Sequence, residues 1–140
     1  MTPDPAAAGW KPMRSGGFSE LVGPILARRE GEHWAYAFQS GPSHENRQGA
    51  VHGGMLMFFA DHAIGAIAWE ASGRRRCVTM QLDTHFVSAA VPGDFIECRG
   101  EAVRTARSVI FMRGELTVGE RVVLSATGIW KVVGEARPSL

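Results

Sequence analysis

Apolar and polar residues alternate loosely over residues 23–39, and a polar turn at residues 30–32 divides the alternation in two. Alternation with a period of two predicts β-strands, and two such runs joined by a short turn predict a hairpin. The stretch that follows, residues 40–49, is dense in Gly, Pro, Ser and Asn, which is typical of a loop. We therefore expect a first hairpin followed by a long loop.

A helical pattern extends from residue 53 to residue 71. Apolar residues recur there three and four positions apart, at Leu56, Phe59, Ala60, Ala63, Ile64, Ile67 and Ala68. This spacing predicts a helix. Because almost every other position is apolar too, the helix should be buried on most sides. The pair Ser72-Gly73 is a typical helix stop.

The remaining pattern predicts strands. Residues 78–86 alternate, the turn at residues 91–94 precedes a long run over 95–118 that is interrupted around 104–108, and residues 121–133 hold the last strand. The order is two strands, one long helix, and three or four antiparallel strands. One helix cannot cover both faces of a sheet, but a curved antiparallel sheet can wrap around one helix. We therefore predict the α+β class.

Composition fits a single domain with no strongly charged partner. The chain has 140 residues, of which 45% are apolar and 21% charged, and its formal net charge is +1. A chain of this length can bury one core. The small net charge gives no electrostatic reason to expect nucleic acid or a membrane as a partner. No segment approaches the roughly 20 consecutive apolar residues of a membrane helix.

The N-terminal segment lacks the basic and then apolar stretch of a secretory signal, so we expect a cytoplasmic protein. Its Pro, Ala and Gly content predicts a flexible arm. The two cysteines, Cys77 and Cys98, lie in apolar surroundings and should behave as small hydrophobic side chains.

Asp61 is the carboxylate with the strongest claim to a chemical role. It lies in the middle of the predicted helix, in the apolar stretch FFADHAIGAIAW, where an unpaired charge is costly and where Asp is a poor helix former. It could be a nucleophile or general base. The alternative is an Asp satisfied by a neighbouring chain or a hydroxyl at a subunit interface. Its neighbour His62 points about 100° away around the helix, so the two should not face one site.

A specific motif surrounds the start of this helix. The run His44-x-Asn46-x-x-Gly49-x-x-His52-Gly53-Gly54, followed by Asp61, resembles the PaaI-like acyl-CoA thioesterases of the hotdog superfamily. The resemblance implies a curved antiparallel sheet wrapped around one long central helix over residues 18–134, with a flexible N-terminal arm (1–17) and a C-terminal tail (135–140) outside it. It also implies acyl-CoA as substrate, no metal or organic cofactor, and a homodimer or a tetramer of two dimers.

Gly53 lies where the helix begins. A free backbone N–H there, together with the helix dipole, suits the polarisation of a thioester carbonyl, and the absent side chain lets a substrate approach. The alternative is a glycine pair that merely permits a tight turn. Gly53 and Asp61 are eight residues apart, about 12 Å along a helix axis. If both are catalytic, one site must combine Gly53 of one subunit with Asp61 of another, as antiparallel helices across a two-fold axis would allow.

The resemblance assigns roles to further residues. Asn46 would bind the thioester oxygen or position water, and its alternative is an Asx-turn in the loop. His52, with Gly54 and Met55, is a candidate for substrate binding, although His52 is as well suited to bracing the loop. His44 is expected to pack in the loop. Thr79 occupies the position of a hydroxyl partner for the acidic residue.

Strand alternation places Thr79 opposite the apolar set of Val78, Met80 and Leu82, on a face turned to a neighbouring subunit or to solvent. The coenzyme A phosphates could pair with the run Arg74-Arg75-Arg76, or with Arg104 and Arg107.

Two other functions remain open. One is a hotdog dehydratase or hydratase. Asp61 after the His-Gly-Gly run argues against it, because those enzymes resemble a different pattern. The other is a non-catalytic acyl-CoA-binding hotdog protein. The sequence shows no metal-ligand spacing, no phosphate-binding glycine loop and no serine-elbow motif. A phenylacetyl-like or a medium-chain acyl group would both be compatible with it.

Overall fold

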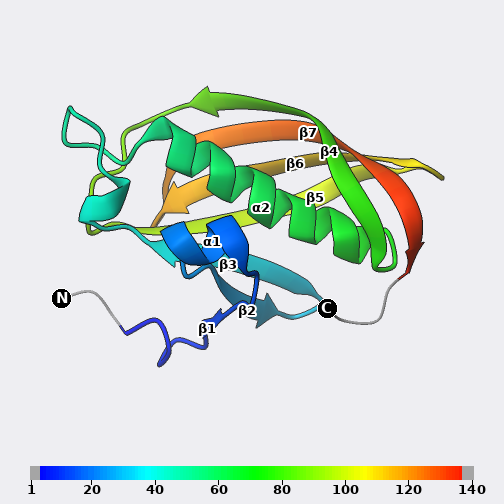
Figure 1. Cartoon of the computed structure of the whole chain (residues 1–140), viewed down its shortest axis with the longest axis horizontal. Coiled ribbons are helices and arrows are strands. Elements are labelled where there is room, and N and C mark those ends of the chain that lie inside the picture. Colours follow the sequence, from blue (N-terminus) through cyan, green and yellow to red (C-terminus); the bar gives the residue numbers. More distant parts are fainter. Residues whose placement is uncertain (1–3, 137–140) are drawn as a thin grey trace.

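The computed structural model describes residues 4–136, and these form one curved antiparallel sheet around one long helix (Figure 1). The helices are α1 (Gly17–Val22) and α2 (Gly53–Ala71), with a 3-10 turn at Pro42–His44. The seven strands lie in the order β1 (Lys11–Pro12), β2 (Leu26–Glu30), β3 (His33–Gln39), β5 (Phe95–Thr105), β6 (Val109–Val118), β7 (Arg121–Ala136) and β4 (Arg75–Phe86). Of the helices in this part of the chain, none is long and apolar enough to cross a membrane.

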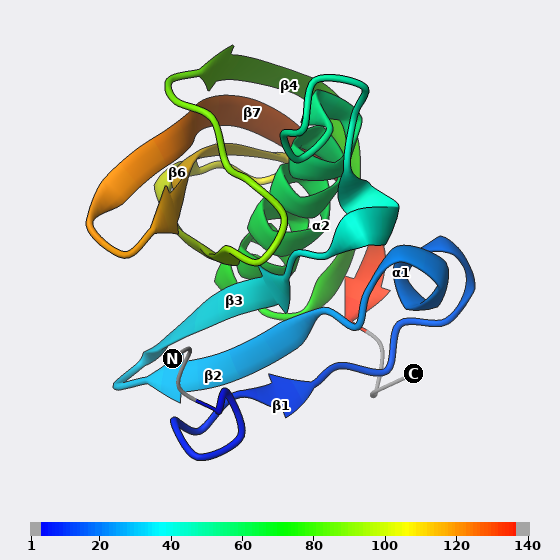
Figure 2. The ribbon, with the colours of Figure 1, turned by 90° about the vertical axis from the view of Figure 1, so that its left-hand side faces the viewer.

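The core lies between α2 and the concave face of the sheet, which curves around the helix in the end-on view of Figure 2. The largest core side chains come from the helix and from the central strands, for example Phe59, Phe38 and Trp130. Burying each such side chain stabilises the fold by about 1.5–3 kcal/mol. A Cβ on Gly114 of β6 would lie 2.9 Å from the end of the Ile64 side chain of α2, so the glycine lets helix and sheet approach closely.

The predicted elements match this architecture closely. The first hairpin turns at Gly31, which has a positive φ of 64°, and α2 begins and ends at the two residues expected from the pattern. The long run after residue 94 divides into β5 and β6. The α+β class and the curved antiparallel sheet around one central helix are therefore confirmed.

Part of the segment predicted as a flexible arm (1–17) packs on the sheet. Trp10 is buried, β1 pairs with β2, and the Arg28 guanidinium lies 4.3 Å from the centre of the Trp10 ring. Residues 1–3 of the predicted arm and 137–140 of the predicted tail (135–140) lie outside the described residues, and β7 continues to Ala136. The limits 18–134 stay a prediction.

A β-bulge in β4 changes which side chains face the helix. Thr79 pairs with Trp130 and Gln81 with Ile129, so Met80 is an extra residue without a partner opposite. Before the bulge, Thr79 faces α2; after it, Leu82 packs against the core. The predicted apolar set therefore does not share one face, because the bulge reverses the alternation: Leu82 is half-buried, whereas Val78 and Met80 are 44% and 59% exposed.

Candidate active site

The first turn of α2 leaves one backbone donor free. His52 is the N-cap, and its Nδ1 atom accepts a 2.8 Å hydrogen bond from the N–H of Gly54. The N–H groups of Met55 and Leu56 bond to the carbonyl of His52 at 3.0 and 3.2 Å. The N–H of Gly53 has no partner within residues 4–136. At the positive end of the helix dipole, it can donate to a developing negative charge.

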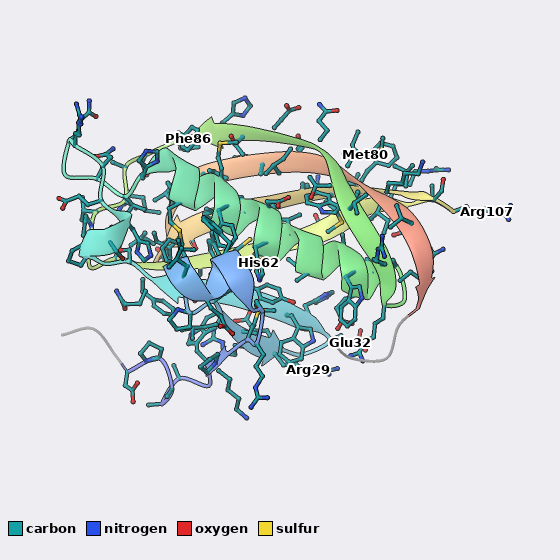
Figure 3. All side chains as sticks on the ribbon, in the orientation of Figure 1. Arg29, Glu32, His62, Met80, Phe86 and Arg107 are labelled. Carbon is teal, nitrogen blue, oxygen red and sulfur yellow. The ribbon has the colours of Figure 1, made fainter. Side chains whose placement is uncertain are left out.

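The two glycines lie close to neighbouring side chains. A Cβ on Gly53 would lie 3.2 Å from the Phe86 ring, and one on Gly54 would lie 3.0 Å from Nδ1 of His52. Neither glycine has a positive φ. A tight turn therefore does not account for the pair. Figure 3 shows Phe86 beside the beginning of α2.

Asp61 lies two turns further along α2 and is half-buried. Its Oδ1 atom accepts a 2.6 Å hydrogen bond from the hydroxyl of Thr79 on β4. None of the ion pairs formed by residues 4–136 involves Asp61. The carboxylate is thus oriented by a hydroxyl rather than neutralised by a cation, which leaves it available as a base or nucleophile.

The adjacent His62 belongs to a different environment. Its ring lies 5.5 Å from that of Phe58, and its Nε2 atom is 3.4 Å from the hydroxyl of Ser15 near α1 (Figure 3). Burial lowers the pKa of His62 below 6.5, although the charge of Asp61 acts in the opposite direction. A lowered pKa disfavours the charged ring, so His62 is not a fixed cation beside Asp61.

The loop before α2 is held by side chains that bond to its backbone. Oδ1 of Asn46 accepts from the N–H groups of Gln48 and Ala50, at 2.8 and 3.1 Å, as in an Asx-turn. These two bonds use only Oδ1, so the amide NH₂ of Asn46 can still donate a hydrogen bond to another group. His44 is buried, accepts from Gly41 N–H at Nδ1 and donates from Nε2 to the carbonyl of Val22 at 2.6 Å, in agreement with a packing role.

A cavity of about 220 Å³ adjoins the beginning of α2. It brings together the three residues predicted to bind substrate, His52, Gly54 and Met55. Its remaining lining comes from the loop and from α1: Phe18, Val22, Ser43, His44 and Glu45. Asn46, Gly53 and Asp61 do not line this cavity.

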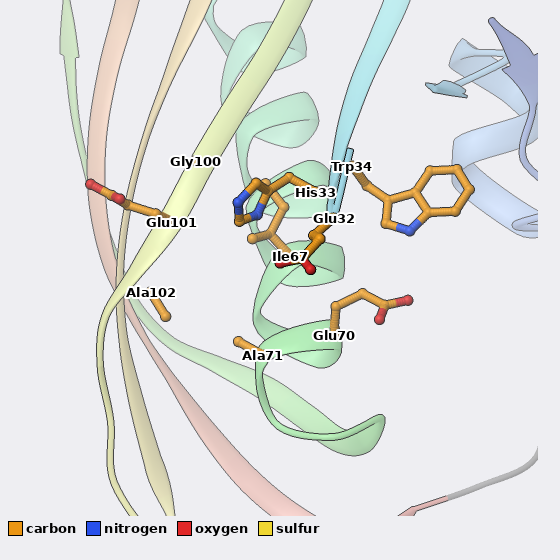
Figure 4. A pocket seen from close by; sticks show the side chains of 9 residues that line it. All are labelled: Glu32, His33, Trp34, Ile67, Glu70, Ala71, Gly100, Glu101 and Ala102. Atoms are coloured by element: carbon orange, nitrogen blue, oxygen red, sulfur yellow. The ribbon is translucent and has the colours of Figure 1, made fainter. Parts of the chain in front are cut away.

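A larger cavity, of about 410 Å³, lies at the other end of α2 between β3 and β5 (Figure 4). Glu32, Glu70 and Glu101 all contribute to its lining, and no residue predicted for the site does. This cavity is therefore not the candidate active site.

Two of the arginines considered for phosphate binding contact the end of α2. Arg74 forms an ion pair with Glu70 and lies over the Trp69 ring at 5.2 Å. Arg75 donates from Nε to the carbonyl of Ser72 at 2.9 Å.

Within residues 4–136, no group of three or more His, Cys, Asp or Glu side chains is close enough to hold a metal ion.

Sequence reasoning missed three residues of this region. Phe86 covers Gly53, and its place in an alternating strand gave no sign of that contact. Phe18 and Val22 reach the cavity from α1, a six-residue helix that no periodic pattern marks. All three come from segments distant in sequence from the motif.

A family model described as the thioesterase superfamily matches residues 48–125. A Pseudomonas aeruginosa protein, PA0474, which is only provisionally named an esterase, is 30% identical over 125 residues, covering 87% of this chain and 93% of that protein.

Solved structures resemble the whole architecture. Protein BH2602 of Bacillus halodurans, solved with CoA, has a TM-score of 0.78 at 22% identity and covers 89% of this chain and 83% of its own. A variant of the phenylacetic acid degradation protein PaaI of Thermus thermophilus has a TM-score of 0.71 at 22% identity, covering 83% and 98%. A hypothetical thioesterase of Streptococcus pneumoniae with coenzyme A has a TM-score of 0.70 at 24% identity, covering 81% and 88%. These likenesses confirm the hotdog fold.

Proposed function

This chain belongs to the thioesterase superfamily, and we propose that it hydrolyses acyl-CoA thioesters to a free acid and coenzyme A. The observation that carries the proposal is a pair of complementary groups on α2. The unpaired N–H of Gly53 can stabilise an oxyanion, and the Asp61 carboxylate, bonded to Thr79, can act as base or nucleophile. The neighbours solved with coenzyme A support the substrate class.

Hydrolysis would proceed by addition to the thioester carbonyl. As base, Asp61 takes a proton from water while the water oxygen bonds to the carbonyl carbon. The carbonyl oxygen becomes negative and accepts from the Gly53 N–H, a contact typically worth about 2.7–4 kcal/mol in the transition state. The C–S bond then breaks, and the proton held by Asp61 passes to the sulfur. As nucleophile, Asp61 would instead bond to the carbonyl carbon as the C–S bond breaks, and the coenzyme A thiolate would leave and take a proton from solvent. Water would then hydrolyse the resulting anhydride to the free acid and the Asp61 carboxylate.

The two groups would act together only across a homodimer. Gly53 and Asp61 of one chain are about 12 Å apart along α2, too far for one carbonyl to contact both. Antiparallel helices about a two-fold axis would place Gly53 of each subunit by Asp61 of the other. β4 is an edge strand of the described sheet, with Val78 and Met80 exposed, which supports a contact between copies there. Two such dimers could form a tetramer.

The remaining predicted residues complete the proposed site. His52, Gly54 and Met55 would contact substrate through the cavity beside Gly53. Asn46 would donate from its amide NH₂ to the thioester oxygen or to the attacking water, and Thr79 would orient Asp61. A cytoplasmic location stays a prediction from the sequence.

A thiol-release assay with aryl- and fatty-acyl-CoA thioesters tests the function. We expect Asp61→Asn and Asp61→Ala to lower turnover at least about 100-fold, the scale of a lost base or nucleophile. Glu120→Gln is the matched control, because Glu120 is an exposed carboxylate in the turn between β6 and β7, outside α2 and the edge strand β4. Undiminished hydrolysis by both Asp61 variants would reject the assignment. A wild type that binds these thioesters but hydrolyses none would favour a non-catalytic acyl-CoA-binding protein.

A further inference from the structure

The cavity beside Gly53 has an apolar wall and a polar rim. Phe18 and Val22 of α1 face Met55 of α2, whereas Ser43, Glu45 and His52 supply the polar atoms. Its volume of about 220 Å³ is below the roughly 300–1,000 Å³ of pockets that hold drug-sized ligands. The cavity can therefore hold only a small part of an acyl-CoA.

That part is the acyl group. His52 and Gly54 line the cavity, and they are the chain neighbours of Gly53, whose N–H is the proposed donor to the thioester carbonyl. A group attached to that carbonyl can extend into the cavity. The exposed Glu45 carboxylate, which also lines the cavity, disfavours the negatively charged coenzyme A end there. An apolar wall suits a hydrocarbon or aryl group.

Phe18 forms the outer wall. It lines the cavity and is still 59% exposed, so little protein lies behind its ring. The ring rests edge-on against Phe58 of α2, with centroids 4.9 Å apart. At the end of α1, the carbonyl of Val22 accepts the 2.6 Å hydrogen bond from His44. Both ends of the wall are thus fixed to the elements that build the site.

We propose that α1 is the acyl-selecting wall of this thioesterase, and that the Phe18 ring limits the length of the acyl group. The inference rests on the proposed function. It assigns a compact acyl group, short and unbranched or a single aryl ring, as the preferred substrate. Removing the Phe18 ring should open the cavity to solvent and let a longer chain leave through the gap.

The test compares Phe18→Ala with Leu21→Ala. Leu21 is on the same helix and 81% exposed, but it does not line the cavity, so its removal controls for a general loosening of α1. We would measure kcat/KM for butanoyl-CoA and decanoyl-CoA. The decanoyl-to-butanoyl ratio should rise at least about 10-fold in Phe18→Ala, the lower end of the discrimination that a hydrophobic pocket shows for one methylene. It should rise less in Phe18→Leu and stay within about twofold in Leu21→Ala.

Binding of non-hydrolysable thioether analogues of the same two acyl groups separates this inference from the hydrolysis itself. The ratio of their dissociation constants could depend on Phe18 in a protein that hydrolyses nothing. That result would support the role of Phe18 in acyl selection and reject the proposed thioesterase activity. Unchanged ratios of the dissociation constants in Phe18→Ala would overturn the proposed role of Phe18 and leave the proposed hydrolysis standing. An equal shift in Leu21→Ala would also overturn it. Analogues that do not bind the wild type at all would overturn both proposals.

Discussion

At the scale of single residues, the backbone N–H of Gly53 can be removed with little change to the helix. Proline has no N–H and is favoured at the first helical position. The preceding residue, His52, has ψ 133°, within the range that a following proline requires. Gly53→Ala is the matched control, because it adds the same Cβ beside Phe86 but keeps the N–H.

We expect Gly53→Pro to lower kcat about 100- to 1,000-fold relative to Gly53→Ala, which is the usual cost of losing one oxyanion donor. Steady-state kinetics with the best thioester of the panel would measure it, and circular dichroism would check that α2 is intact. Equal kcat values for the two variants would show that the carbonyl is held elsewhere.

Residues of the site could be predicted from sequence only where they form one motif. His44, Asn46, His52, Gly53 and Asp61 lie within eighteen positions, so their spacing was visible. The Thr79–Asp61 contact was suggested by resemblance alone, because strand alternation did not point Thr79 at the helix. Phe86 and Phe18 reach the site through tertiary packing, which leaves no local pattern in a single sequence.

At the scale of elements, a carboxylate joins two strands that are not neighbours. Glu30 of β2 accepts two 2.8 Å hydrogen bonds from Arg99 of β5, across the intervening β3. Hydrogen bonding from Arg99 is the main cause that lowers the pKa of Glu30 from 4.5 to about 2; Arg28 adds to it, and burial opposes it. Arg28 also contacts the Trp10 ring, so this group of side chains ties β1 to the sheet.

Because the pKa of Glu30 is lowered by folding, its contribution to stability is present above pH 4.5 and lost as the pH falls toward about 2. We expect Glu30→Gln to reduce the free energy of unfolding by up to about 1 kcal/mol at pH 7, a value limited by solvent screening of an exposed pair. The difference from wild type should shrink between pH 4.5 and 2. Urea denaturation at several pH values measures it.

Glu101→Gln is the control, since the Glu101–Arg113 pair is more exposed and joins adjacent strands only. At pH 7, Glu101→Gln should reduce the free energy of unfolding less than Glu30→Gln does. A Glu30 effect that is absent at pH 7, or one that persists undiminished at the lowest pH, would contradict the assignment.

Elements differ in how far the sequence determines them. α2 is long and periodic, so its first and last residues could be predicted, and Gly31 marks the first hairpin. β1 has two residues and α1 six, too few for a period to appear. The bulge at Met80 depends on which residues of β7 lie opposite, which one strand's sequence does not contain.

At the scale of the whole molecule, the same helix carries both halves of the proposed chemistry and keeps them apart. The helix is rigid along its length, so no local movement brings Gly53 and Asp61 to one carbonyl. Met57 lies between them on α2 and is 38% exposed, and Val78 and Met80 are exposed on the nearby edge strand. These apolar side chains lie where the proposed partner subunit would cover them.

A mixture of two inactive variants tests this arrangement. Gly53→Pro lacks the donor and Asp61→Ala lacks the carboxylate, so a dimer of either variant has two defective sites. After subunit exchange at equal amounts, half of the dimers contain one chain of each variant. In these, Gly53 of the Asp61→Ala chain meets Asp61 of the Gly53→Pro chain, which completes one site, and the other site lacks both groups. Activity should therefore recover to about one quarter of that of the wild type. Sites built within single chains would recover nothing, because no chain in the mixture carries both groups.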